Sequence, residues 1–198
     1  GCRVEHAEDL IDAGQYGCRP PEHLLGAAEY NLVSRPPRAG STTTFCMCPG
    51  GEILCATSEA GQISTNGMSR YARASGFANA GLIVNQPVAR DEDGLKAFDL
   101  IARIEQAAFA AGGGDYTCPA QSCAAFLRGA AGPAVTHSSY RLGVRPGRID
   151  RLLPAETATA IGEALKHFER IIPGFLTKGA LVGVETRVSS PVRFDRDE

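Results

Sequence analysis

The sequence predicts an α+β domain in which a mostly antiparallel β-sheet carries an inserted helical lobe. Segments of strand-like composition lie toward both ends of the chain. Between residues 91 and 175, apolar residues instead recur at the three- and four-residue steps of amphipathic helices. Strands that enclose a helical block, rather than alternating with helices, indicate this architecture.

The first half of the chain consists mainly of expected strands. A short helical turn is expected at residues 7–13, and the Pro-rich stretch 35–40 is expected to be a loop. Pro49, Gly50 and Gly51 separate two strand-like runs, and this arrangement predicts a β-hairpin. The strands of this half are expected at residues 2–5, 30–33, 42–48, 52–57, 62–66 and 81–85.

Three helices are expected in the second half. The glycine run at 112–114 ends the first helix, because glycine readily adopts the left-handed conformation of a C-cap. Pro119 opens the second helix and Pro154 opens the third, since proline is favoured at the first helical position. Strands at residues 180–187 and 191–194 are expected to complete the sheet.

The composition indicates a globular domain and excludes several functional classes. The 198 residues suit one domain, with 43% hydrophobic and 21% charged residues. The 20 Lys and Arg against 22 Asp and Glu give a net charge of -2, so we expect no nucleic acid and no membrane surface as a partner. No apolar run approaches the roughly 20 residues of a transmembrane helix. Residue 1 is Gly rather than Met, and we expect the chain to be a segment of a longer protein.

The seven cysteines are too sparse for a disulfide scaffold. Without a recognisable secretory leader, a reducing cytoplasmic location is expected. One residue separates Cys46 from Cys48, and four residues separate Cys118 from Cys123. Neither spacing matches a zinc knuckle, so no metal site is expected. On a strand, Cys46 and Cys48 would point to the same face, which could be either a pocket or the core.

Two polar segments are candidates for a binding site. Residues 65–71, with Asn79, form a stretch of small polar side chains that is either a functional loop or a plain turn. Residues 185–193 follow the apolar run 180–184. Polar residues at the end of a buried strand are typical of a binding site, but they also occur on blunted edge strands. The residues alone leave both alternatives open.

Several ordered motifs resemble those of one protein family. They include TFCMCPGG at 44–51, STNGMS at 64–69 and GVETRVSSPVR at 183–193, and the likeness runs along nearly the whole chain. With these motifs, the chain resembles a family of bacterial FAD-dependent oxidoreductases, generally described as uncharacterised FAD-dependent dehydrogenases. In that family, the Rossmann fold that binds FAD is split into two parts. The resemblance places residues 1–198 between those parts, as a single substrate-side domain that caps the flavin and carries the helical lobe 91–175.

The resemblance also implies roles for individual residues. FAD is expected to be bound mainly by parts of the protein outside this chain, and the Rossmann domain of the same polypeptide is the expected partner, together with a small-molecule substrate. Arg187, Cys46 and Cys48 are the expected catalytic residues. The residues expected to contact the flavin are Thr186, Arg187, Ser189 and Ser190, and those expected to contact the substrate are Asn66, Gly67, Met68, Ser69, Tyr71 and Asn79.

Two other functions remain as alternatives. The chain could be a freestanding module that binds a ligand or metal through Cys46 and Cys48, or a protein-interaction domain without a pocket. A redox role for the two thiols is open as well, although the single intervening residue would strain a disulfide ring. That role would also require an accessible thiol with a suitable pKa.

Overall fold

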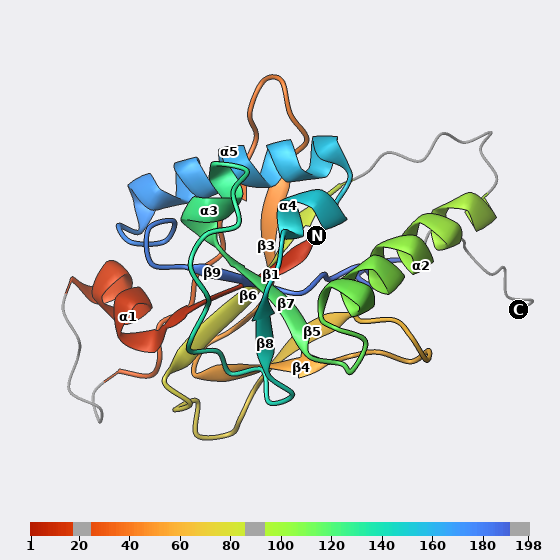
Figure 1. The fold of residues 1–198 in the computed structure, drawn as a ribbon. Helices are drawn as coiled ribbons and strands as arrows, with labels where there is room; N and C mark the ends of the chain where they lie inside the picture. The colour runs from red at the N-terminus through yellow and green to blue at the C-terminus, as the bar shows by residue number, and fades with distance from the viewer. Residues whose placement is uncertain (18–24, 86–93, 191–198) are drawn as a thin grey trace, which may run out of the picture.

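A computed structural model describes residues 1–17, 25–85 and 94–190, and it shows two sheets and a layer of helices (Figure 1). The larger sheet has seven strands in the order β2-β3-β6-β1-β9-β7-β8, and only the β7–β8 pair is parallel. A second sheet consists of the antiparallel pair β4-β5. The strands are β1 (Cys2–Ala7), β2 (Val33–Ser34), β3 (Thr42–Cys48), β4 (Gly51–Cys55), β5 (Thr65–Ser69), β6 (Phe77–Val84), β7 (Cys118–Ser122), β8 (Val144–Pro146) and β9 (Ala180–Val182).

One group of helices and the small sheet lie on opposite faces of the main sheet. Figure 1 shows α5 on one face, whereas β4 and β5 pass beneath the other. Helix α2 projects from the side of the molecule, and none of the helices within the described ranges is both long and apolar enough to span a bilayer. The helices are α1 (Glu8–Tyr16), α2 (Gly94–Ala111), α3 (Cys123–Leu127), α4 (Ile149–Leu152) and α5 (Ala155–Ile171).

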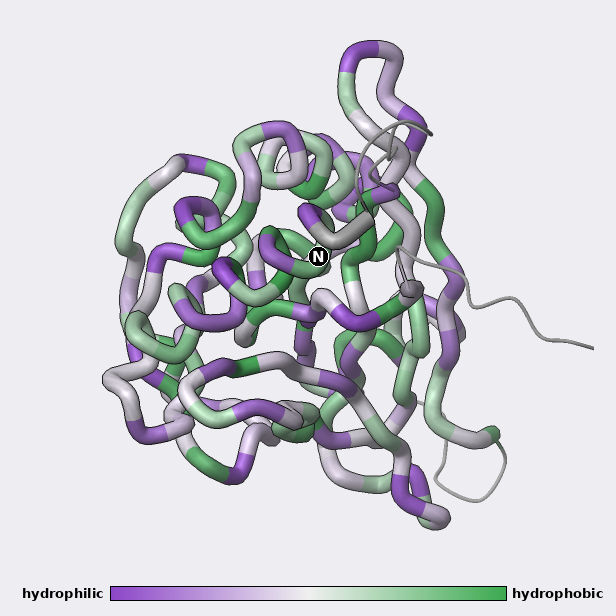
Figure 2. Tube along the Cα trace, turned by 90° about the vertical axis from the view of Figure 1, so that its right-hand side faces the viewer, coloured by the Kyte–Doolittle hydropathy of each residue, from purple (hydrophilic) through white to green (hydrophobic). Residues whose placement is uncertain are grey.

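The central strand β1 separates an apolar layer from a polar one. Because successive strand side chains point to opposite faces, Val4 and His6 face the helical layer while Arg3 and Glu5 face the small sheet. His6 packs on Phe175, with ring centroids 4.3 Å apart, and the amphipathic helix α5 buries its apolar face there. In Figure 2, coloured by hydropathy, the N-terminus lies near the middle of the face that α2 borders in Figure 1.

The fold class is confirmed: the chain is mixed α and β with a mostly antiparallel sheet and several helices. The expected hairpin around Pro49–Gly51 is wrong, since β3 pairs with β2 and β6 whereas β4 pairs with β5. A register shift between Phe45 and Cys48 bends β3, and Gly50 turns the chain with a φ of 52°. These two features carry the chain from one sheet into the other.

The expected start of the second helix at Pro119 is also wrong, because residues 118–122 form the inner strand β7. Pro119 contributes its carbonyl to the pairing, accepting a hydrogen bond from the Gly183 N–H at 2.8 Å. Helix α3 begins only after Ser122, whose hydroxyl accepts a hydrogen bond from the Ala125 N–H. Residues 94–175 therefore contain four helices and also two strands of the main sheet.

Four further expectations differ from the structure or lie outside it. Residues 65–69 form strand β5 rather than a loop. The expected strand 180–187 is shorter, since β9 ends at Val182 and Gly183 follows with a φ of 64°. The expected strand at 191–194 and the start of the helix at 91–93 lie outside the described residues.

Candidate functional site

Residues 185–190 form an extended segment at the junction of the two sheets. Just before it, the Val184 carbonyl accepts hydrogen bonds from Thr65 of β5, from the N–H at 2.8 Å and from the hydroxyl at 3.0 Å. The Glu185 N–H donates to the Gly1 carbonyl at 3.0 Å. The segment is thus fixed to both sheets at its start, and its polar residues lie among three cavities.

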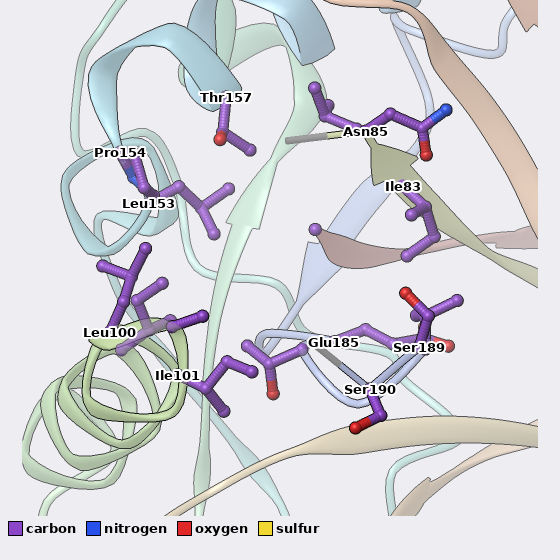
Figure 3. A pocket seen from close by; sticks show the side chains of 16 residues that line it. Ile83, Asn85, Leu100, Ile101, Leu153, Pro154, Thr157, Glu185, Ser189 and Ser190 are labelled. Carbon is purple, nitrogen blue, oxygen red and sulfur yellow. The ribbon is translucent and has the colours of Figure 1, made fainter. Parts of the chain in front are cut away.

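The first cavity has a volume of about 420 Å³ and lies between α2, the end of β6 and the α4–α5 connection (Figure 3). Its walls are mainly apolar, with Ile83 on one side and Ile101 and Leu153 on the other. Polar groups are contributed by Asn85, Thr157, Glu185, Ser189 and Ser190. Such a combination of apolar walls and a few polar groups is typical of small-molecule and cofactor sites.

The second cavity lies on the other side of residues 188–190 and has a volume of about 480 Å³. It shares Ile101 and residues 188–190 with the first cavity. Its polar lining includes Arg187 together with the acidic residues Glu59 and Asp99. Residues 188–190 therefore border two hollows at once.

The third cavity is small, about 100 Å³, and it brings together three residues predicted for the site. Cys46, Asn66 and Arg187 all line it, although they come from β3, β5 and the segment after β9. Glu185 lines it as well. From the sequence, only the family resemblance predicted that these residues share a site. In the structure, the packing of the two sheets brings them to the same cavity.

Arg187 is held by a buried carboxylate of α2. Its Nε donates to Glu105 Oε1 at 2.9 Å and one terminal nitrogen donates to Oε2 at 2.6 Å. Glu105 is fully buried, and the Thr186 hydroxyl donates to the same carboxylate. These hydrogen bonds raise the pKa of Arg187 above its usual value. Ser58 and Gln62 each accept a further hydrogen bond from its terminal nitrogens, so the guanidinium ties residues 186–187 to α2 and to residues 58–62.

A second charged group, Arg3, is completely buried between the two sheets. Its guanidinium donates to both oxygens of Glu185, at 3.0 and 2.9 Å, and to Asn79 Oδ1 at 2.8 Å. It also donates to the Cys46 carbonyl and contacts the sulfur of Cys48 at 3.3 Å. Burial raises the pKa of Glu185, while the Arg3 charge opposes that rise. Arg3 thus links the segment after β9 to the bulge of β3.

The two thiols of the CMC motif do not share a face, so that prediction is wrong. Cys46 has a φ of 43° at the irregular part of β3, and its side chain is exposed. Cys48 is buried, and burial raises the pKa of its thiol despite the opposing Arg3 charge. A regular strand would have kept the two side chains on one side, and the bulge separates them.

The other residues expected to contact substrate are dispersed. Asn79 is buried beside Arg3, and Gly67 lies so close to Arg3 that an added Cβ would fall 2.0 Å from a guanidinium nitrogen. The Ser69 hydroxyl donates to the Pro49 carbonyl at 2.9 Å. Met68 and Tyr71 are exposed. Of this set, Asn66 lines a cavity beside Arg187, and the structure does not gather the remainder around it.

Sequence reasoning missed Arg3 and Glu105. The signal for Arg3 was a charged residue between Cys2 and Val4 in a predicted strand. The signal for Glu105 was a carboxylate on the apolar stripe of α2, next to Ile101 and Ile104. A buried charge needs a partner. The sequence could therefore have predicted that each residue has a partner, but it could not identify that partner.

A metal centre has no structural support within the described ranges. No group of three or more His, Cys, Asp or Glu side chains there is arranged to hold an ion. His6 is buried against Phe175, and the buried thiols Cys118 and Cys123 have strongly raised pKa values caused by burial. Raised pKa values disfavour the thiolate that a metal site requires.

Comparison with known protein families decides which family the chain belongs to. A model of the FAD-dependent protein, C-terminal domain-like family matches residues 1–188. The chain belongs to this family. It is therefore a domain of an FAD-dependent protein, and FAD is the cofactor associated with the family. The match includes segment 185–188 and all of the Arg3 and Glu105 contacts described above.

A bacterial relative is longer than this member of the family. The chain is 33% identical over 203 residues to an uncharacterized protein of Clostridium beijerinckii. The alignment includes all of this chain but only 38% of that protein. The chain thus spans less than half the length of the relative.

Proposed function

We propose that this chain is the substrate-side domain of a cytoplasmic FAD-dependent oxidoreductase of the dehydrogenase type, and that it covers the flavin and shapes the substrate pocket. The observation that carries the proposal is the position of residues 185–190, which contribute to all three cavities. Most of the FAD-binding contacts are made by a Rossmann-type domain elsewhere in the same polypeptide. The family and the length of the Clostridium relative support this division.

We also propose that the chain lies between the two halves of a split Rossmann domain. The alignment with the Clostridium relative includes only 38% of that protein, which leaves length for both halves.

The first cavity suits an isoalloxazine ring. Ile83, Ile101 and Leu153 provide apolar surface for a flat aromatic ring, while Ser189 and Ser190 provide hydroxyls for its polar edge. Bound flavin supplies hydride or electron transfer. The apolar walls exclude water from the ring, and Thr186, held by Glu105, helps to fix the segment that carries the two serines.

Arg187 and the two cysteines have different proposed roles, because their side chains differ in exposure. Arg187 places a positive charge at the border of the second and third cavities, where it stabilises negative charge on the flavin or substrate. Cys46 is exposed beside it and can contact substrate. Cys48 is buried under Arg3, so its part in catalysis would be limited to positioning Cys46 through the bulge.

The flavin spectrum of the full-length protein tests this proposal. Replacing Ser189 and Ser190 by Ala should shift the visible absorbance of bound FAD, because two hydroxyls near the ring are lost. Thr159→Ala serves as the control, since Thr159 is exposed on α5 and its hydroxyl donates only to the Ala155 carbonyl of that helix. An unchanged spectrum and unchanged FAD affinity in the serine variant would remove residues 189–190 from the flavin site.

A further inference from the structure

The first half of α2 is apolar and poorly covered. Phe98 is 41% exposed and Leu100 is 40% exposed, whereas Glu105 and Ala108 in the second half are fully buried. Ile101 and Ile104 are only partly buried. In Figure 1 this helix projects from the side of the sheet, with its second half nearer the body. A helix that is apolar on more than one side is normally covered by protein.

The exposed half of α2 is continuous with other apolar surface. Leu100 and Ile101 border the first cavity together with Leu153 and Pro154 (Figure 3). Phe98 borders the second cavity. Lys96, Asp99 and Arg103 lie on the same helix and are exposed, so charged groups accompany the apolar ones. An apolar centre with charged groups around it is the usual composition of a protein interface.

We propose that this surface, made of Phe98, Leu100, Ile101, Leu153 and Pro154, is the docking face for the FAD-binding part of the same polypeptide. We call it the α2 docking face. The inference deepens the proposed function and rests on it, because the occupant is the part that holds the flavin. It adds that α2 is an interdomain contact and not only a wall of a ligand cavity.

The length of the relative favours this occupant over a second copy of the domain. Gly1 borders the first cavity, next to Leu100 and Leu153. In a polypeptide as long as the Clostridium protein, residues that precede this position would emerge beside the α2 docking face. A covalently attached domain has a high effective concentration at such a surface, which a separate copy lacks.

Photo-crosslinking in the full-length protein tests the inference. A benzophenone side chain would replace Phe98, and in a control protein it would replace Leu142, which is also exposed, at 55%, and borders none of the three cavities. We expect position 98 to crosslink to the FAD-binding part of the same molecule and position 142 to give several-fold lower yield. Crosslinks from position 98 to residues 1–198, to a second copy, or to nothing would overturn the inference.

A charge substitution provides a second readout. We expect Leu100→Asp to increase hydrogen exchange of the α2 amides at least roughly tenfold, because burying one leucine is worth about a factor of ten in an equilibrium constant. Leu142→Asp should leave that exchange unchanged. Equal exchange in both variants would contradict docking. FAD content measured on the same samples separates the two proposals, since a flavin-free protein that still crosslinks at position 98 would refute the proposed function and not the docking.

Discussion

At the scale of single residues, the most informative feature is the charge buried between the two sheets. Arg3 has no exposed surface, yet its donors are directed at Glu185, Asn79 and the bulge of β3. Breaking one partner of such a group leaves a buried charge uncompensated, which costs more than the pair contributes. Glycine at positions 67 and 81 makes room for the network, because a Cβ at either would collide with Arg3 or Glu185.

Gly67→Ala should therefore destabilise the domain. The added Cβ would fall 2.0 Å from a guanidinium nitrogen of Arg3, and overpacking of this kind costs about 1–3 kcal/mol. The free energy of unfolding from urea titration is the measurement. Gly26→Ala is the matched control, since nothing lies within 4 Å of its Cβ and we expect no more than a small change. Equal stabilities for the two variants would show that Arg3 is not tightly enclosed.

His6 predicts a loss of stability in acid. Burial lowers its pKa to about 4 from an ordinary value of 6.5, so the folded state binds fewer protons than the unfolded state between these values. Its stabilising effect is therefore fully present above pH 6.5 and is lost as the pH falls toward 4, by about 3 kcal/mol. His6→Gln, which keeps a donor for the Phe175 carbonyl, should lose less stability than the wild type over this range. Parallel pH profiles of the two proteins would refute the assignment.

At the scale of elements, the sequence predicted regular segments well and their pairing poorly. Strand β1, the amphipathic helices α2 and α5, and the turn at Gly50 follow from local composition and periodicity. The separation of β3 from β4 does not, because it depends on a bulge at Cys46 and on the partners β5 and β6. Pro119 shows the same limit, since burial within the sheet overrides its preference for a helix start.

For the candidate site too, the local segment was predictable from the sequence and its distant partners were not. The site segment 185–193 is predicted from polar residues after an apolar run, together with the family resemblance, and the structure describes it as far as residue 190. Its neighbours were not predicted, because Glu105 and Arg187 are 82 residues apart in sequence and meet only through the packing of α2. The two cysteines were placed on one face by strand periodicity, which a single irregular residue reverses.

The contact between α2 and residues 186–187 predicts energetic coupling between Glu105 and Arg187. In a double-mutant cycle, Glu105→Gln and Arg187→Ala should be non-additive by about 1–2 kcal/mol, as expected for a partly exposed ion pair with two hydrogen bonds. Glu163→Gln on α5 is the control, because its ion pair with Lys166 is exposed and should not couple to Arg187. Additive effects would show that the pair does not fix the segment.

The same two variants separate positioning from charge in the full-length enzyme. Arg187→Ala removes both the tether and the positive charge, so we expect it to lower turnover more than Glu105→Gln, which weakens the tether and leaves the charge. Steady-state kinetics and the flavin spectrum measure both effects. If the two variants lowered turnover equally, Arg187 would act through position alone. If neither changed turnover, Arg187 would lie outside the site.

At the scale of the whole molecule, the parts combine into one face. Gly1, the first cavity and the exposed half of α2 lie together, next to the segment that Glu105 and Arg3 hold in place. The chain has no phosphate-binding glycine loop of its own, and we propose that this face meets the part of the FAD-dependent protein that carries one. The rest of the flavin site would come from the other part of the polypeptide.

The most direct test is the FAD content of the full-length protein, purified without added flavin and then titrated with FAD. We expect about one FAD per chain, and we expect residues 1–198 alone to bind FAD far more weakly. A full-length protein that neither carries FAD nor binds it on titration would contradict a flavin-capping role. So would stoichiometric, tight binding of FAD by residues 1–198 alone.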